Sequence, residues 1–67
     1  MDKQQASRLA QKIESDDAQV RVTGTRHYDT GYVLDCVDAR TGTRFTVSSW
    51  VEWDVRVAES QGYQGVL

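Results

Sequence analysis

The segment SSWVEWDVRVAES, residues 48–60, is compatible with two secondary structures, and the choice between them decides the fold. Val51, Trp53 and Val55 alternate with polar residues, and this period of two is typical of a strand. Stepping by about 100° per residue instead places most of the apolar side chains on one broad arc of a helix. That arc holds Trp50, Val51, Trp53, Val55, Val57 and Ala58.

Capping residues and burial favour the helix. Ser49 with Glu52 three residues later has the pattern of a capping box, and Gly62 is placed to end the helix. Glu52 and Arg56 have the i, i+4 spacing of a favourable ion pair. The valines lower helix propensity by about a few tenths of a kcal/mol each. Burying a large apolar side chain contributes roughly 1.5–3 kcal/mol, so the helix is predicted.

A second helix is predicted in MDKQQASRLAQKIES, at residues 1–15. Its apolar side chains recur at i, i+3, i+4 and i+7, which gives one narrow stripe. Asp2 and Gln5 have the spacing of an N-cap pair. The short polar side chains of residues 15–17 compete for the backbone and indicate the end of the helix. The stripe consists of Ala6, Leu9, Ala10 and Ile13.

Three segments between the helices have strand patterns: residues 18–23, 32–38 and 43–47. A loop is expected over residues 24–31, and a turn over 38–42, where Gly42 can take a positive φ. The strands form an antiparallel meander. Its inner face is expected to collect Val20, Val22, Tyr32, Leu34, Cys36, Phe45 and Val47.

The predicted fold is therefore α+β, in the order α-β-β-β-α, with both helices on one face of a three-stranded antiparallel sheet. Residues 1–61 form a single small domain, and residues 62–67, which contain two glycines, are expected to fray. With 67 residues the chain offers little room for a deep pocket, because most large side chains are needed in the core.

Composition narrows the classes of function. A net charge of −2 with 27% charged residues does not indicate a strongly basic partner surface for nucleic acid or anionic lipid. The single cysteine, Cys36, favours a reducing cytoplasm, and neither a membrane span nor a signal peptide is expected. Arginine outnumbers lysine and asparagine is absent, which favours a GC-rich bacterial or phage genome.

The chain has few residues suited to catalysis. His27 lies near Asp29 and could form an acid–base pair with it, but a solvated loop histidine is expected instead. Cys36 is expected in the sheet core, where burial makes a thiol inert. One histidine and one cysteine do not complete a structural zinc site, and no phosphate-binding glycine motif occurs. We therefore expect no enzyme activity, no cofactor and no metal.

The favoured function is a non-enzymatic protein–protein interaction domain that uses the outer face of the sheet. Val33 and Val37 are expected on this face, with Arg21 and Arg44 around them, as an apolar centre inside a polar rim. The partner would be another protein or a second copy of the chain, since small domains often supplement a limited core by self-association.

Two other classes remain open. Residues 18–44 carry four arginines against three aspartates, a local charge of +1. Arg21, Arg26, Tyr28 and Arg44 could therefore bind single-stranded nucleic acid through the sheet face and the first hairpin loop. An inhibitor or immunity-type partner of an enzyme is the third class, and it has the same sequence signature as a general interaction domain.

Overall fold

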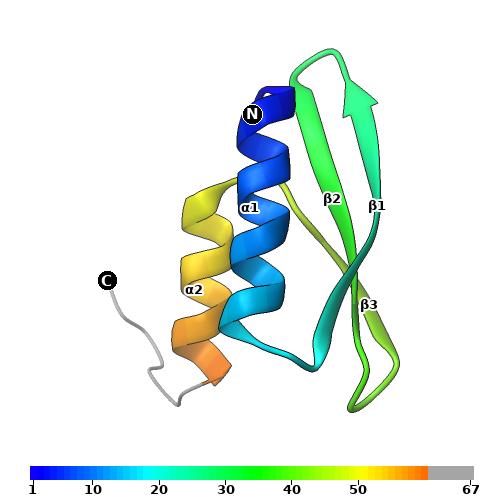
Figure 1. Ribbon diagram of the computed structural model, residues 1–67, viewed down its shortest axis with the longest axis vertical. Helices are drawn as coiled ribbons and strands as arrows, with labels where there is room; N and C mark the ends of the chain where they lie inside the picture. Colours follow the sequence, from blue (N-terminus) through cyan, green and yellow to red (C-terminus); the bar gives the residue numbers. More distant parts are fainter. Residues whose placement is uncertain (61–67) are drawn as a thin grey trace.

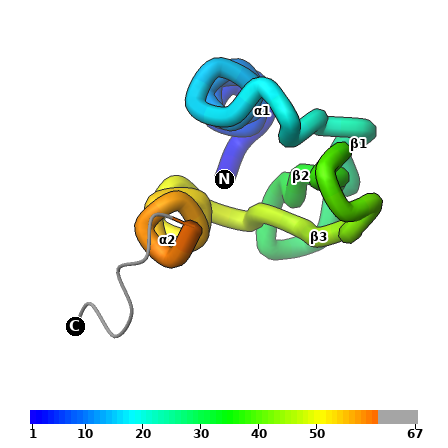
Figure 2. Tube along the Cα trace, turned by 90° about the horizontal axis from the view of Figure 1, so that it is seen from below, coloured from blue at the N-terminus to red at the C-terminus, as the bar shows by residue number. Residues whose placement is uncertain are grey.

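The computed structural model describes residues 1–60 and has the predicted order α-β-β-β-α. The strands form one antiparallel sheet in the order β1-β2-β3. Figure 1 shows the two helices side by side, and Figure 2 shows that both lie on the same side of the sheet. The expected fraying of residues 62–67 lies outside the described residues. The elements are α1 Lys3–Asp16, β1 Val20–Tyr28, β2 Gly31–Asp38, β3 Thr43–Val47 and α2 Trp50–Ser60.

Helix α1 begins and ends where its capping residues predict. The Asp2 carboxylate accepts a hydrogen bond from the Gln5 N–H at 2.8 Å, and the Gln5 side chain accepts from the Asp2 N–H at 3.0 Å. After the helix, Asp17 takes an extended conformation, and its carboxylate accepts the Gln19 N–H at 3.0 Å. The apolar stripe of α1 faces β1 and β2, so the narrow helix covers only that part of the sheet.

Helix α2 confirms the helical prediction for residues 50–60, although its cap forms only in part. The Glu52 N–H donates to Ser49 Oγ at 3.1 Å, as a capping box requires. The Glu52 carboxylate, however, accepts from the Ser48 hydroxyl at 2.6 Å, and no ion pair joins Glu52 to Arg56 in residues 1–60. The Arg56 guanidinium instead lies 3.4 Å from the centre of the Phe45 ring, a cation–π contact that links α2 to β3.

Only part of the broad apolar arc of α2 packs against the core. Trp53 is 2% exposed, and its indole N–H donates to Asp16 Oδ2 at the end of α1, at 2.9 Å. Val51 and Val55 point away from the core and are 71% and 52% exposed. The arc spans roughly 200° at 100° per residue, which is wider than the side that α2 turns toward the rest of the fold. Two of the valines on the predicted apolar arc are therefore exposed.

Strand β1 is longer than predicted, and the expected loop over residues 24–31 was wrong. The pairing with β2 shifts register between Val22 and Gly24 and then continues to Tyr28 opposite Gly31. A β-bulge of this kind inserts an extra residue, so every later side chain changes face. Residues 26–28 therefore belong to the strand, and only Asp29 and Thr30 form the turn. The strand also begins at Val20, two residues after the predicted start.

The core lies between the sheet and the two helices, as predicted. All seven residues predicted for the inner face are either buried or pack against the buried cluster. Partly buried members are Val22, Tyr32 and Phe45. The turn between β2 and β3 is tied to the end of α1 by Arg40, which contacts Asp17 at 2.7 Å and Asp38 at 3.0 Å. The buried cluster consists of Ala6, Leu9, Ile13, Val20, Leu34, Cys36, Val47 and Trp53.

Candidate functional site

The face of the sheet that points away from the helices is not covered by either helix (Figure 2). Strand pairing arranges its side chains in rows. Val37 lies between Arg21 on β1 and Arg44 on β3, since both arginines are its direct cross-strand partners. We call this surface the outer face. It consists of Arg21, Thr23, Arg26, Tyr28, Val33, Asp35, Val37, Arg44 and Thr46.

The two valines of the outer face are only partly exposed, and the register explains why. Val33 is paired with Arg26, and Val37 has an arginine on each side. Directly opposite residues have Cβ atoms about 4.5–5.5 Å apart, so the methylene groups of an arginine can cover a neighbouring valine. Val33 and Val37 thus lie on either side of Asp35 along β2, each beside an arginine of a neighbouring strand.

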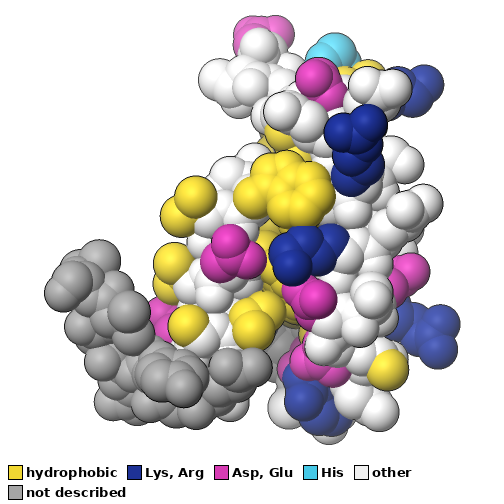
Figure 3. Space-filling view, turned by 60° about the vertical axis from the view of Figure 1, so that its left-hand side comes forward, with side chains coloured by type: hydrophobic (Ala, Val, Ile, Leu, Met, Phe, Trp, Pro, Cys, Tyr) yellow, Lys and Arg dark blue, Asp and Glu magenta, His cyan; other side chains and the backbone are white. Residues whose placement is uncertain are grey.

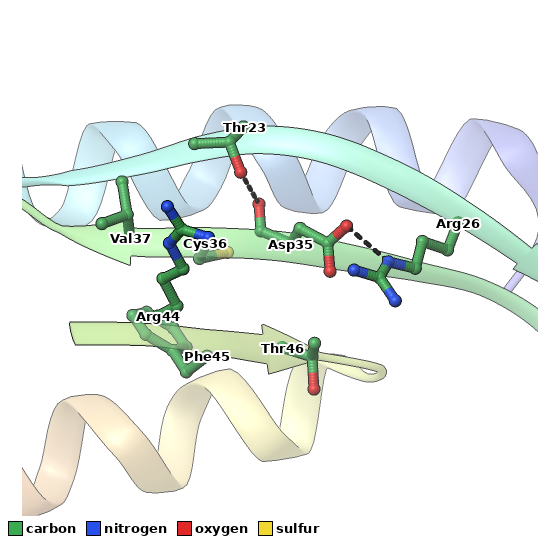
Figure 4. Close-up of a pocket in the computed structure, with 8 residues that line it drawn as sticks. All are labelled: Thr23, Arg26, Asp35, Cys36, Val37, Arg44, Phe45 and Thr46. Carbon is green, nitrogen blue, oxygen red and sulfur yellow. Dashed lines mark hydrogen bonds and ion pairs between the residues drawn. The ribbon is translucent and has the colours of Figure 1, made fainter. Parts of the chain in front are cut away.

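A shallow groove of about 490 Å³ lies on this face. In Figure 4 its side chains come from all three strands, and Arg44 extends from β3 toward Val37 on β2. The groove is lined by Arg26 and Asp35 as well as by Val37 and Arg44, so it extends along β2 beyond the row of Arg21, Val37 and Arg44. Its lining combines two guanidinium groups, two threonines, one carboxylate, one valine, one cysteine and one phenylalanine. It is lined by Thr23, Arg26, Asp35, Cys36, Val37, Arg44, Phe45 and Thr46.

One of the three arginines on the outer face is held by an ion pair. Arg26 Nε lies 2.8 Å from Asp35 Oδ2, and this carboxylate raises the pKa of the Arg26 guanidinium (Figure 4). The Thr23 hydroxyl donates to the backbone carbonyl of Asp35 at 3.3 Å. Within residues 1–60, Arg21 and Arg44 form no ion pair. With three guanidinium groups against one carboxylate, the outer face carries a net charge of +2.

The structure brings all the predicted site residues to this one face. Arg21, Val33, Val37 and Arg44 lie on it as their strand parity predicts. Arg26 and Tyr28 also lie on it, but as strand residues after the bulge, because the hairpin loop expected to carry them is absent from residues 26–28. Sequence reasoning missed the Arg26–Asp35 pair. The isolated Gly24 within a strand pattern was the signal for a bulge that could have revealed it.

Of the residues considered for catalysis, His27 lies off the outer face and Cys36 is buried. The His27 ring stacks on Tyr32 with 4.4 Å between ring centres, so it forms a cross-strand aromatic pair on the inner side of the hairpin. Cys36 is a free, buried thiol, and its burial raises its pKa to about 11. A thiol with such a pKa is almost entirely protonated at neutral pH and is a poor nucleophile.

The described part of the chain also bears on metal binding and membrane insertion. Residues 1–60 contain no cluster of three or more histidine, cysteine, aspartate or glutamate side chains that could hold a metal ion. Neither of the two helices is long and apolar enough to cross a membrane. Comparisons of the chain with protein-family models, with curated proteins and with solved structures found no match.

Proposed function

We propose that this chain is a non-enzymatic interaction domain that binds a protein partner through its outer face. The observation that carries the proposal is the row in which Val37 lies between Arg21 and Arg44 on a sheet face that no helix covers. Protein interfaces commonly have an apolar centre and a polar rim, with arginine enriched. An uncovered sheet face with this arrangement fits a contact surface better than a catalytic centre.

The energetics of the outer face support binding of a partner with negative charge. Arg21 and Arg44 are exposed and unpaired in residues 1–60, so binding an acidic group does not first require breaking an ion pair. Charge complementarity of this kind mainly increases association rate and selectivity. Affinity would come from covering Val33 and Val37, at about 25 cal/mol per Å² of apolar surface removed from water.

A double substitution tests the proposal. Val33→Asp with Val37→Asp places carboxylates at the centre of the face and should abolish both self-association in sedimentation velocity and capture of a partner by the immobilised chain. Ser7→Asp with Gln11→Asp, on exposed positions of α1, makes the same change in charge and should leave both unchanged. Circular dichroism checks that each variant folds. The proposal fails if the wild-type chain sediments as a monomer and captures no more protein than the valine variant.

A second candidate function has one specific observation in its favour. The bulge at Gly24 turns Arg26 onto the same face as Arg21 and Arg44, and Tyr28 on that face is 49% exposed. Arginines beside an aromatic ring suit single-stranded nucleic acid. Fluorescence anisotropy with oligonucleotides at low salt tests this function, and binding should fade steeply as salt rises. The absence of a signal at low salt would exclude it. Asp35 lies on the central strand β2 of the outer face and disfavours nucleic-acid binding, because a carboxylate repels phosphate.

The setting that we propose for this function is the cytoplasm of a bacterium or a phage-infected cell. Cys36 is a free thiol in the structure, in keeping with a reducing compartment. The excess of arginine over lysine supports a GC-rich genome.

A further inference from the structure

Helix α2 has a second apolar stripe, on the side opposite the buried Trp53. Val51 and Val55 are one turn apart and are 71% and 52% exposed. At about 100° per residue, Ala58 lies between them and Asp54 around the helix, and it continues the stripe by a further turn. In Figure 3 hydrophobic side chains lie over α2 beside a carboxylate. We take this stripe of Val51, Val55 and Ala58 as a candidate contact surface.

Acidic residues flank this stripe on both sides. Glu52 and Glu59 lie along one edge, about 40–100° around the helix from the valines, and Asp54 lies along the other. The remaining charged side chain of α2, Arg56, is turned toward the fold, where its guanidinium stacks on Phe45. The exposed side of α2 is therefore an apolar strip between carboxylates.

The exposed side of α2 and the outer face match each other. One has valines between carboxylates. The other has Val33 and Val37 among the guanidinium groups of Arg21, Arg26 and Arg44, with Asp35 between the two valines and paired with Arg26. The lengths also agree. Val51 to Ala58 spans about 10 Å at 1.5 Å per helical residue, and Val33 to Val37 spans about 13 Å at 3.3 Å per strand residue. The net charges of the two surfaces are opposite in sign.

We propose that the partner of the outer face is helix α2 of a second copy of this chain, bound head to tail. This inference rests on the proposed function and names its occupant. Pairing the outer face with itself would bring like guanidinium groups together, and pairing α2 with itself would do the same with carboxylates, so neither symmetric contact has complementary charge. A head-to-tail contact leaves one free α2 and one free outer face at the ends, and subunits therefore add into chains or close into a ring.

Two variants, each with one half of the contact removed, test the inference. Arg21→Glu with Arg44→Glu disables the outer face and leaves α2 intact. Val51→Gln with Val55→Gln disables the stripe of α2 and leaves the outer face intact, and glutamine is a good helix former. All four positions are exposed, so both variants should keep the wild-type circular dichroism spectrum. Lys3→Glu with Arg8→Glu on α1 repeats the charge change of the first variant away from both surfaces.

The expected result in sedimentation velocity is a wild-type mass that rises with concentration and falls as salt is added, because salt screens the charged rims. Each disabled variant alone should remain monomeric, and the α1 control should behave as wild type. An equal mixture of the two disabled variants should form a dimer with about twice the monomer mass and no larger species, since only one intact contact can form.

Three results would overturn the inference. A monomeric wild type at every concentration would remove it, as would a mixture of the two variants that stays monomeric. Loss of association in the arginine variant with full association in the glutamine variant would show that α2 is not the occupant, while the outer face would still be a docking surface. Failure of the inference is thus distinguishable from failure of the proposed function.

Discussion

Replacing Trp53 by alanine should remove most of the stability of this domain, because that side chain joins α2 to the rest of the core. Trp53 is 2% exposed, and its indole N–H donates to Asp16 Oδ2 at 2.9 Å. In the helix that we describe, Trp53 faces the core, and Val55 faces solvent with 52% exposure. A strand over residues 50–57 would instead place both residues on the same face.

The expected cost follows from the burial. A buried tryptophan removes roughly 200 Å² from water, which at about 25 cal/mol per Å² corresponds to about 5 kcal/mol as an upper value. Measured tryptophan-to-alanine substitutions in cores cost about 3–5 kcal/mol. Loss of the hydrogen bond to Asp16 accounts for about 1 kcal/mol of the change. Because a domain of this size has a free energy of unfolding near the low end of about 5–15 kcal/mol, the variant should be largely unfolded.

Urea denaturation followed by circular dichroism measures the effect, and Trp53→Phe keeps the experiment informative if the alanine variant is unfolded throughout. The phenylalanine variant should lose about 1–2 kcal/mol, from the missing hydrogen bond and the smaller ring. Val55→Ala is the matched control on the same helix and should change the free energy of unfolding by no more than about 0.5 kcal/mol. Equal costs for Trp53→Ala and Val55→Ala would refute the helical placement of both residues.

Three further predictions concern the backbone, acid stability and the thiol. Gly31→Ala should destabilise the fold more than Gly42→Ala in urea denaturation. Both glycines have positive φ, 122° and 74°, but only at Gly31 would a Cβ meet backbone, 2.7 Å from the carbonyl oxygen of the first residue; equal costs would contradict this. The folded-state pKa values of Asp16 and Asp38 lie below the ordinary 3.8 because of their hydrogen bonds to Trp53 and Arg40, so their stabilisation is present above that value and is lost as pH falls below it. The urea midpoint should therefore drop in acid, and Asp38→Asn should flatten the drop; an unchanged slope would argue against the Asp38 contacts. The pKa of Cys36, about 11 against an ordinary 9.0, predicts alkylation of the folded chain at least about a hundredfold slower than that of the urea-unfolded chain, and similar rates would show an accessible thiol.

Helix ends and strand order could be predicted because they depend on local chemistry. Asp2 with Gln5 caps α1 through contacts within three residues of the sequence, and Ser49 starts α2 in the same way. The alternation of apolar residues in β2 and β3 fixed which side chains face the core, since a one-residue slip would expose all of them. These features require no knowledge of distant parts of the chain.

The features that sequence reasoning missed depend on tertiary contacts. The side of α2 that becomes buried is set by where β3 and α1 end, so a single 200° arc could not show that Val51 and Val55 stay exposed. Arg56 had a good helical partner in Glu52, but the Phe45 ring on β3 was the closer neighbour.

The outer face likewise has some features that could be predicted from the sequence and others that depend on tertiary contacts. The parity of Val33 and Val37 followed from sequence alone, because β2 is a regular strand without a bulge. The place of Arg26 did not, because the bulge beside Gly24 exchanges the two faces for the rest of β1. Its ion pair with Asp35 became visible only once the two strands were in register.

The most direct test of contact through the outer face is to record methyl and amide NMR shifts of the full chain as its concentration rises. We expect the methyl signals of Val33 and Val37 and the amide signal of Arg44 to move together along one binding curve, while the amide of Arg8 on α1 stays constant. Shifts that stay unchanged at every concentration, or changes confined to α1, would contradict the account.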